Sequence, residues 1–244
     1  MLFSKLIAQS QERLQRFGIQ SPTSFQETIS EEILNTPTCL SPKKWQKKRP
    51  DLKEICDQCL FKHNNPLFSL VENQPDKKGL ENLLEEELRL FLKTNARLKI
   101  INTPFQNSSY PSSMLLQTDN GILAYLQFYY VSEPIFVNLS KRYCYEASVS
   151  LEINRLVEEL TSIEAELDRP AFYVYWFDLP CTKGIFFNTS EQLKDYLYCS
   201  EEPKKSSIIR ETRLYPPLQE MGDLEELVFI LQSIKKEGVL PLVY

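Results

Sequence analysis

Glu87 lies on the apolar side of a predicted helix, where an unpaired carboxylate is unfavourable. Residues 79–96 carry apolar side chains at helical spacing, and at about 100° per residue Glu87 falls inside the arc they occupy. The apolar members of this arc are Leu80, Leu84, Leu88, Phe91 and Leu92. Because burying a bare charge is costly, Glu87 must be ion-paired, hydrogen-bonded, metal-bound or at the edge of a cleft. It is therefore a candidate catalytic acid. The alternative is that it reaches water at the rim of the stripe or pairs with a Lys or Arg.

A second set of residues could bind a metal ion. Cys56 and Cys59 have the Cys-x-x-Cys spacing of zinc ligands, His63 follows them as the only histidine, and Cys39 lies upstream. Cys56, Cys59 and His63 also fall on one apolar helical stripe, where the thiols would be ordinary core side chains. We favour the core interpretation, because finger-type Cys-x-x-Cys pairs generally sit on turns and this segment has no Gly or Pro. We therefore expect no bound cofactor here.

Residues 43–53 form a basic segment in an acidic protein. The net charge of −5 and the isoelectric point near 5.2 argue against general coating of nucleic acid, but not against a local contact. The cationic side chains that could meet phosphates are Lys43, Lys44, Lys47, Lys48, Arg49 and Lys53. The alternative is an ordinary solvated face.

The elements that must position these residues fall into two regions. Residues 1–75 predict a helical N-terminal extension that begins with an amphipathic helix over 2–17 and ends in a linker containing Pro66, Asn73, Pro75 and Asp76. Residues 79–244 predict an α/β domain. Its expected helices are 79–96, 146–167, 190–199 (capped by Ser190) and 223–236, and its expected strands are 98–102, 112–118, 122–131, 171–177 and 184–187. Residues 135–139 either extend the sheet or form another edge strand.

The predicted order of helix, three strands, helix and strand resembles the PD-(D/E)xK nuclease-like fold. The resemblance covers residues 79–200 and implies a restriction-endonuclease-like core, with a central mixed sheet flanked by helices. In that family a Pro-Asp, a Glu-x-Lys and often a helical glutamate converge on divalent cations that activate water. Here Pro111-Ser112 stands at the Pro-Asp position and Gln127-Phe-Tyr129 at the Glu-x-Lys position, while Glu87 matches the helical acid.

The departures from this pattern imply a catalytically degenerate member. Neither Ser112 nor Gln127 carries a charge and Tyr129 is no cation, so Glu87 is the only intact element. We therefore expect a nucleic-acid-associated protein that contacts DNA or RNA through the basic segment. One alternative is an active Mg²⁺-dependent nuclease whose site has migrated, using Glu87, Gln127 and Asp119. Glu133 and Asp178 are further acids near strand ends. The other alternative is a protein-interaction module that does not bind nucleic acid. Its apolar tail, residues 239–244, could dock on a protein partner or on its own domain.

Composition limits the remaining classes. The 244 residues are 42% hydrophobic and 25% charged, which is typical of a globular protein. No apolar run reaches membrane-spanning length, and Lys5 and Gln9 interrupt the first hydrophobic run, so we expect a cytoplasmic protein without membrane contact. Six cysteines without a framework suit reduced thiols. No Gly-rich phosphate loop or nucleophile elbow is present, which argues against common nucleotide-dependent enzymes and hydrolases.

Overall fold

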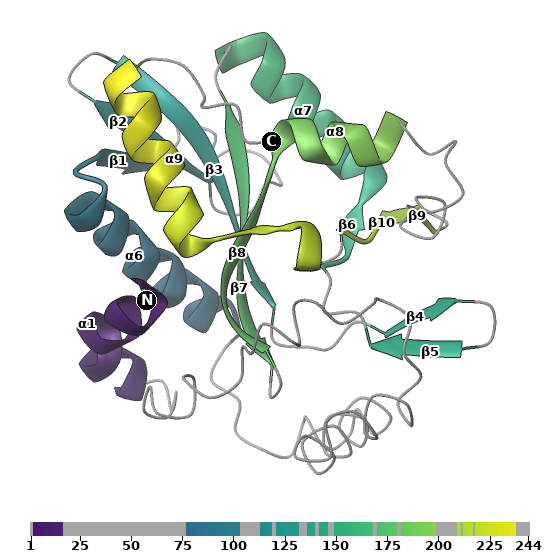
Figure 1. Cartoon of the computed structure of the whole chain (residues 1–244), viewed down its shortest axis with the longest axis horizontal. Helices are drawn as coiled ribbons and strands as arrows, with labels where there is room; N and C mark the ends of the chain where they lie inside the picture. The colour runs from purple at the N-terminus through teal and green to yellow at the C-terminus, as the bar shows by residue number, and fades with distance from the viewer. Residues whose placement is uncertain are drawn as a thin grey trace.

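A computed structural model describes residues 2–16, 77–102, 113–118, 121–131, 136–139, 142–145, 149–167, 170–179, 182–198, 209–210, 212–216 and 218–237. Their centre is a six-stranded mixed sheet (Figure 1). The strands follow the spatial order β1 (Lys99–Asn102), β2 (Ser113–Thr118), β3 (Gly121–Val131), β7 (Ala171–Leu179), β8 (Thr182–Thr189) and β11 (Gly222–Asp223). Only β3 and β7 pair in parallel, and the other neighbours are antiparallel.

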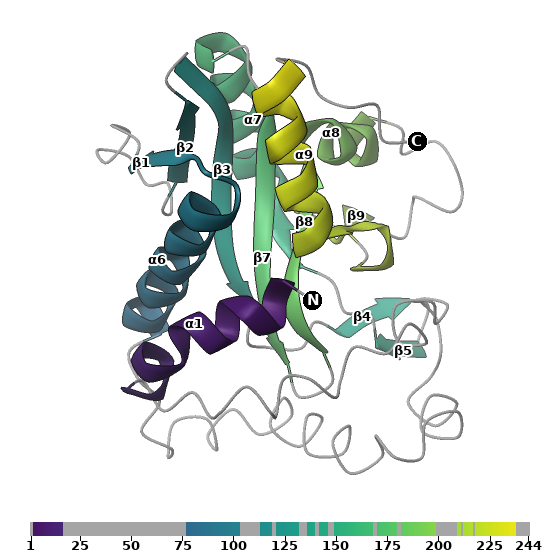
Figure 2. The same ribbon diagram turned by 60° about the vertical axis from the view of Figure 1, so that its left-hand side comes forward.

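Helices cover both faces of this sheet (Figures 1 and 2). One face carries α1 (Leu2–Arg16), α6 (Lys77–Asn95) and α9 (Leu224–Glu237). The opposite face carries α7 (Ile153–Leu167) and α8 (Ser190–Tyr198). The protein is therefore an α/β domain with a mixed sheet between two helical layers, as its predicted element types require. No helix in the described ranges is long and apolar enough to cross a bilayer.

Alternation along the central strands divides the interior into two cores. Leu126 and Phe128 of β3 face α1, α6 and α9, whereas Tyr125 of the same strand faces α7 and α8. In β7 the side chains Phe172, Val174 and Trp176 join the first core, and Ala171, Tyr173, Tyr175 and Phe177 join the second. Both faces of β3 and β7 are thus buried, which explains the nearly unbroken apolar run of 171–177.

The connection between β2 and β3 is a tight hairpin, as the turn sequence Asp119-Asn-Gly121 predicts. Thr118 pairs with Gly121, so two residues link the strands. Gly121 has a φ of 123°, in the region that favours glycine, and a Cβ there would meet no other atom within 4 Å. Backbone conformation, not crowding, therefore explains the glycine.

Helix starts are fixed by side-chain caps. At α8 the Gln192 N–H donates to Thr189 Oγ1 at 3.2 Å, and the Thr189 N–H donates to Gln192 Oε1 at 2.9 Å. This reciprocal pair is a capping box, so the predicted cap at Ser190 is wrong by one residue. At α9 the Glu226 N–H donates to Asp223 Oδ1 at 2.9 Å, an ordinary N-cap bond.

Two segments differ from their predicted roles. Residues 136–139 do not join the central sheet, because β4 (Phe136–Leu139) pairs with β5 (Arg142–Tyr145) in a separate hairpin. The helix predicted from 146 begins only at Ile153. The preceding β6 (Leu151–Glu152) pairs with β10 (Arg213–Leu214), which also pairs with β9 (Ile209–Arg210). Pairing with a segment distant in sequence therefore overrides the local helical spacing. The short 3₁₀ turn η3 (Leu218–Glu220) then leads to β11.

The helix α1 belongs to the same core as the α/β domain. Leu6, Ile7 and Leu14 are buried in one cluster with α6, α9 and the even-numbered side of β7. Phe3 makes an edge-to-face contact with Trp176, with ring centroids 5.7 Å apart. The predicted helix at 2–17 is confirmed, but it packs as a layer of the domain. The other predicted elements of 1–75 lie outside the described residues.

Gly222 illustrates how closely the C-terminal layer packs. A Cβ at this position would overlap the ring of Phe187 and lie 2.7 Å from Glu226 Oε2. Phe187 cannot yield easily, because it is buried edge-to-face against Phe172 with centroids 5.8 Å apart. Glycine is therefore required here by space.

We predict that Gly222→Ala lowers the free energy of unfolding by about 1–3 kcal/mol through overpacking. Denaturant unfolding measures the change. The same substitution in a Phe187→Leu background should cost less, since the smaller side chain makes room for the methyl group. An equal cost in both backgrounds would contradict the steric explanation.

Candidate functional site

Glu87 is buried in the core between α6 and α1. Only 2% of the residue is exposed, and Leu84, Leu88 and Phe91 of the same helix are buried with it. The inward position predicted from helical spacing is confirmed. The helix supplies no partner of opposite charge for this carboxylate; the partner comes from α1.

Arg13 of α1 forms a two-point ion pair with Glu87. Its Nε lies 2.7 Å from Glu87 Oε1, and its Nη2 donates to Glu87 Oε2 at 3.1 Å. The arginine side chain is 46% exposed and the glutamate side chain 1%. The guanidinium thus shields the buried carboxylate from one side while keeping its own contact with water. Of the alternatives open from the sequence, the structure selects pairing with an arginine.

Gln127 lies on the other side of the sheet. Its neighbours Leu126 and Phe128 point into the core that contains Glu87, so the side chain of Gln127 points away from that core. It is 1% exposed, and its Oε1 accepts a hydrogen bond from the Tyr125 hydroxyl at 3.1 Å in the α7–α8 layer. Glu87 and Gln127 are therefore separated by the sheet and cannot share a metal ion or a substrate atom.

The other residues proposed for a nuclease-like site are not brought to Glu87 by any described contact. Ser112, Asp119 and Glu133 lie outside the described residues, as does the side chain of Asp178. Tyr129, two positions after Gln127, shares the face of Gln127 and not that of Glu87. Within the ranges the structure describes, no three His, Cys, Asp or Glu side chains gather as a metal-binding group.

The side of Gln127 carries a polar cluster that the sequence analysis did not identify. Tyr129 of β3 packs between two phenols of β7, with its ring centroid 6.4 Å from Tyr173 and 5.6 Å from Tyr175. Its hydroxyl donates to Glu159 Oε2 of α7 at 3.4 Å. Arg155, one turn earlier in α7, donates from Nε to Glu159 Oε1 at 3.0 Å. The buried Glu159 carboxylate is thus held between the Arg155 cation and the Tyr129 phenol, which packs on two further phenols.

The register of the sheet extends this cluster into a row across three strands. Gln127 is the direct partner of Tyr173 in the parallel pairing, and Tyr173 is the direct partner of Asn188 in β8. All three side chains are at least nine-tenths buried. The row runs beneath α7 and α8 and places amide and phenol groups in an otherwise apolar core.

Electrostatics keeps these groups uncharged or paired. Burial raises the pKa of Tyr129, Tyr173 and Tyr175 above that of a free phenol, and the negative charge of Glu159 adds to the effect. Burial also raises the pKa of Glu159, and the hydrogen bond from Arg155 opposes that shift. The phenols therefore remain protonated and can serve as hydrogen-bond donors, not as nucleophiles or bases.

Several polar atoms of the cluster have no hydrogen-bond partner within the described part of the chain. They are the hydroxyls of Tyr173 and Tyr175, Nη2 of Arg155 and Oδ1 of Asn188. Buried polar atoms of this kind usually bind ordered water or a small polar molecule. The arrangement can hold such a molecule by hydrogen bonds, and it contains no activated group for covalent chemistry.

One sequence signal could have identified this cluster. In the predicted helix over 146–167, Glu159 falls about 60° from Leu156 and about 40° from Ile163, at the edge of the apolar stripe. The same test that singled out Glu87 therefore applies to Glu159, which is 5% exposed. The phenols could not be identified in this way, because a continuous aromatic strand does not reveal which face is polar.

The remaining predicted sites lie outside the described residues. This holds for the zinc candidates Cys39, Cys56, Cys59 and His63, and for the basic side chains Lys43, Lys44, Lys47, Lys48, Arg49 and Lys53. Both hypotheses therefore stay predictions. Comparison with protein-family models gives no match, and comparison with curated protein sequences finds no similar protein. The geometry and the sequence are thus the basis for assigning a function.

We predict that Arg13→Ala lowers the free energy of unfolding by about 2–3 kcal/mol, because it leaves a buried carboxylate without its cation. Arg13→Met combined with Glu87→Leu should recover stability to within about 1 kcal/mol of the parent, since two apolar groups need no partner. Denaturant unfolding of all three proteins measures both effects. Arg16→Ala is the control, because its pair with Glu12 is exposed on both sides. An Arg13→Ala change no larger than the control would contradict the role of the pair.

We predict a pH-dependent difference in stability between the parent and Glu159→Gln. The folded-state pKa of Glu159 is raised, so its contribution is fully present below the ordinary carboxyl pKa and is lost as pH rises through the folded value. The free energy of unfolding of the parent minus that of Glu159→Gln should therefore fall as the pH rises above the ordinary carboxyl pKa of about 4. Exposed Glu158→Gln controls for the loss of one negative charge. A difference that rises with pH would show that pairing with Arg155 outweighs burial.

Proposed function

We propose that this chain is a nucleic-acid-associated protein built on a catalytically degenerate PD-(D/E)xK nuclease-like core. The described elements support the core assignment by their order, because α6, β1, β2, β3, α7 and β7 follow the helix, three strands, helix and strand of that fold. The inserted β4–β5 hairpin and β6 lie between β3 and α7 without interrupting this order.

One observation carries the non-catalytic part of the proposal. Two of the described motif positions, Glu87 and Gln127, stand where the family has cation-binding carboxylates, and neither is free to bind a cation. Glu87 is neutralised by Arg13, and Gln127 is a neutral amide bonded to Tyr125 on the opposite face. Hydrolysis of a phosphodiester with metal assistance needs several carboxylates on one cation. The two positions instead serve the packing of two different helical layers.

The nucleic-acid part of the proposal rests on the sequence of the basic segment. Lysines and an arginine concentrated within 43–49 would contact backbone phosphates and release counterions, which gives affinity without sequence discrimination. The proposal places the protein in the cytoplasm, as its composition and reduced-thiol pattern favour.

Binding to fluorescently labelled duplex and single-stranded DNA and RNA tests the proposal. We predict binding at low salt that weakens steeply as the salt concentration increases. The slope of log binding constant against log salt concentration should become shallower by about 1–2 in Lys47→Gln/Lys48→Gln. The matched control is Lys93→Gln/Lys236→Gln, which removes the same charge from exposed positions on α6 and α9. Absence of binding to every nucleic acid at low salt would refute the nucleic-acid part.

The same preparations test the absence of catalysis. We expect no cleavage of labelled DNA or RNA with Mg²⁺ or Mn²⁺ by the parent or by Glu87→Ala. Metal-dependent cleavage by the parent that is lost in Glu87→Ala would instead establish the active-nuclease alternative.

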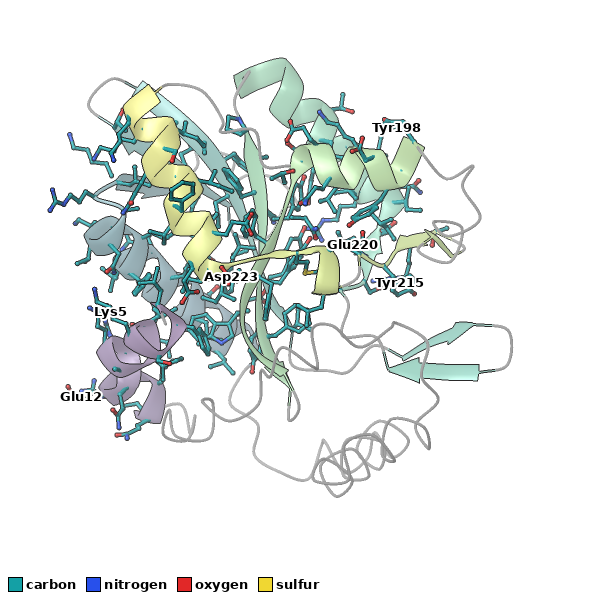
Figure 3. The ribbon with its side chains drawn as sticks, in the orientation of Figure 1. Lys5, Glu12, Tyr198, Tyr215, Glu220 and Asp223 are labelled. Atoms are coloured by element: carbon teal, nitrogen blue, oxygen red, sulfur yellow. The ribbon has the colours of Figure 1, made fainter. Side chains whose placement is uncertain are left out.

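The protein-interaction alternative gains little from the described surface. Two aromatic side chains are strongly exposed, Tyr198 on α8 at 73% and Phe229 on α9 at 63%. They belong to helices on opposite faces of the sheet, and Figure 3 marks Tyr198 at the end of α8 far from α9. They therefore do not form one apolar patch of the kind that protein partners use. Capture of a protein from nuclease-treated extract would favour this alternative.

A further inference from the structure

The polar cluster beneath α7 has hydrogen-bond donors that no described residue meets. They are the hydroxyls of Tyr173 and Tyr175 and Nη2 of Arg155, all of them buried atoms. Other donors of the cluster are used, since Arg155 Nε and the Tyr129 hydroxyl both donate to Glu159. Nucleic-acid binding through the basic segment uses none of these groups. Because an unpaired buried donor is unfavourable, the three free donors indicate a binding partner of their own.

The free donors gather near the Glu159 carboxylate. Tyr129, which donates to Glu159, has its ring centroid 6.4 Å from that of Tyr173 and 5.6 Å from that of Tyr175. The negative charge of Glu159 adds to the effect of burial in raising the pKa of both flanking phenols, so their hydroxyls lie within reach of its field. Arg155 holds the same carboxylate from α7 at 3.0 Å. A molecule that meets the free donors therefore also lies beside Glu159.

Glu159 is able to accept a further hydrogen bond. From the described residues its Oε1 accepts one bond, from Arg155, and its Oε2 accepts one bond, from Tyr129. A carboxylate oxygen has two lone pairs, so each oxygen keeps the capacity for a second bond. The cluster thus offers free donors and an acceptor close together.

The charge balance of the cluster favours an uncharged ligand. The charges of Arg155 and Glu159 cancel, and the Glu159 side chain is only 5% exposed. A bound anion would add an uncompensated charge at this buried place, which is costly. A carboxamide adds no charge, its carbonyl oxygen accepts from donors, and its N–H groups donate to a carboxylate. It therefore matches the free donors and the remaining acceptor together.

Arg155 gives access to the cluster. Its side chain is 39% exposed although its Nη2 is buried, so the guanidinium lies at the boundary between the phenols and solvent. Arginine side chains have several rotatable bonds and are held here by one residue of the same helix. Rotation of Arg155 would open the phenol hydroxyls to a small molecule, and its return would place Nη2 on that molecule.

We propose that this cluster is a binding site for a small molecule that carries an uncharged carboxamide. The carbonyl oxygen of the ligand accepts from Arg155 Nη2 and from the hydroxyl of Tyr173 or Tyr175, and an amide N–H donates to Glu159. The ligand is small, because the groups that bind it are enclosed between β3, β7 and α7. Its binding is independent of nucleic-acid binding through the basic segment.

Acetamide is the probe that tests the site, with acetate as its charged analogue. Ligand-observed NMR on the full-length chain measures the dissociation constant of each compound near neutral pH, and we expect the parent to bind acetamide more tightly than acetate. Tyr173→Phe/Tyr175→Phe removes two donors and should weaken acetamide binding by about tenfold. Tyr198→Phe is the matched control, since this phenol is 73% exposed and Figure 3 marks it at the end of α8. It should bind acetamide as the parent does.

The phenol variants also separate binding from folding. Because the two hydroxyls have no partner among the described residues, the double variant without ligand should unfold at a temperature no lower than the parent. Absence of acetamide binding by the parent, the result expected if only ordered water meets these groups, would overturn the proposal. Equal affinities of the parent and the double variant would overturn it as well.

Glu159→Gln tests why the ligand is uncharged. The substitution leaves Arg155 without its anion, so acetate should now bind more tightly than acetamide. Glu158→Gln removes the same charge from an exposed position of α7 and should keep the preference of the parent. A parent that prefers acetate, or a folded Glu159→Gln that still prefers acetamide, would contradict the assigned ligand class. The phenol variants decide the proposal by themselves if Glu159→Gln fails to fold.

Discussion

The parallel pairing of β3 with β7 determines how the rest of the molecule is arranged. These two strands form the middle of the sheet, and parallel strands must be joined by a crossover that passes over one face. Here α7 lies in that crossover and covers one side of the sheet. The other side must then be covered by helices from outside the crossover, and α6 and α9 supply most of that layer. Because both faces are buried, each side chain of β3 or β7 belongs to one of two separate cores.

This two-sided burial explains why residues close in sequence have unrelated roles. Gln127 and Phe128 are adjacent, but the first is hydrogen-bonded to Tyr125 beneath α7 and the second packs in the core of α6 and α1. The same division separates Gln127 from Glu87. Glu87 and Gln127, which the sequence suggested as members of one site, therefore lie on opposite faces of the sheet in surroundings of different chemistry.

Glu159 and Glu87 are both buried carboxylates that need a cation, and they obtain it from different parts of the chain. Glu159 has its cation within its own helix, one turn away at Arg155, and Tyr129 of the sheet donates a hydrogen bond to it. Glu87 has its cation on a helix that lies more than seventy positions earlier in the chain, and the hydrogen bond to Arg13 spans a sequence separation of 74. Local pairing keeps the first carboxylate and its cation within one helix. Distant pairing makes the second carboxylate the point at which α1 is fixed to the domain.

Sequence alone determined most of the local structure. The spacing of apolar residues located α6, α7 and α9 to within a few positions except at the start of α7, and Asp119-Asn-Gly121 indicated the hairpin that Gly121 closes. The same spacing also predicted that Glu87 points inward, because helical periodicity is a property of the chain itself. Tertiary structure decided which partner each group has. Arg13 as the cation for Glu87, the phenols around Glu159, and the pairing of β6 with β10 all join segments far apart in sequence, and no local pattern encodes such contacts. The physical reason is that periodicity fixes the direction of a side chain relative to its own element, whereas its surroundings depend on which elements pack together.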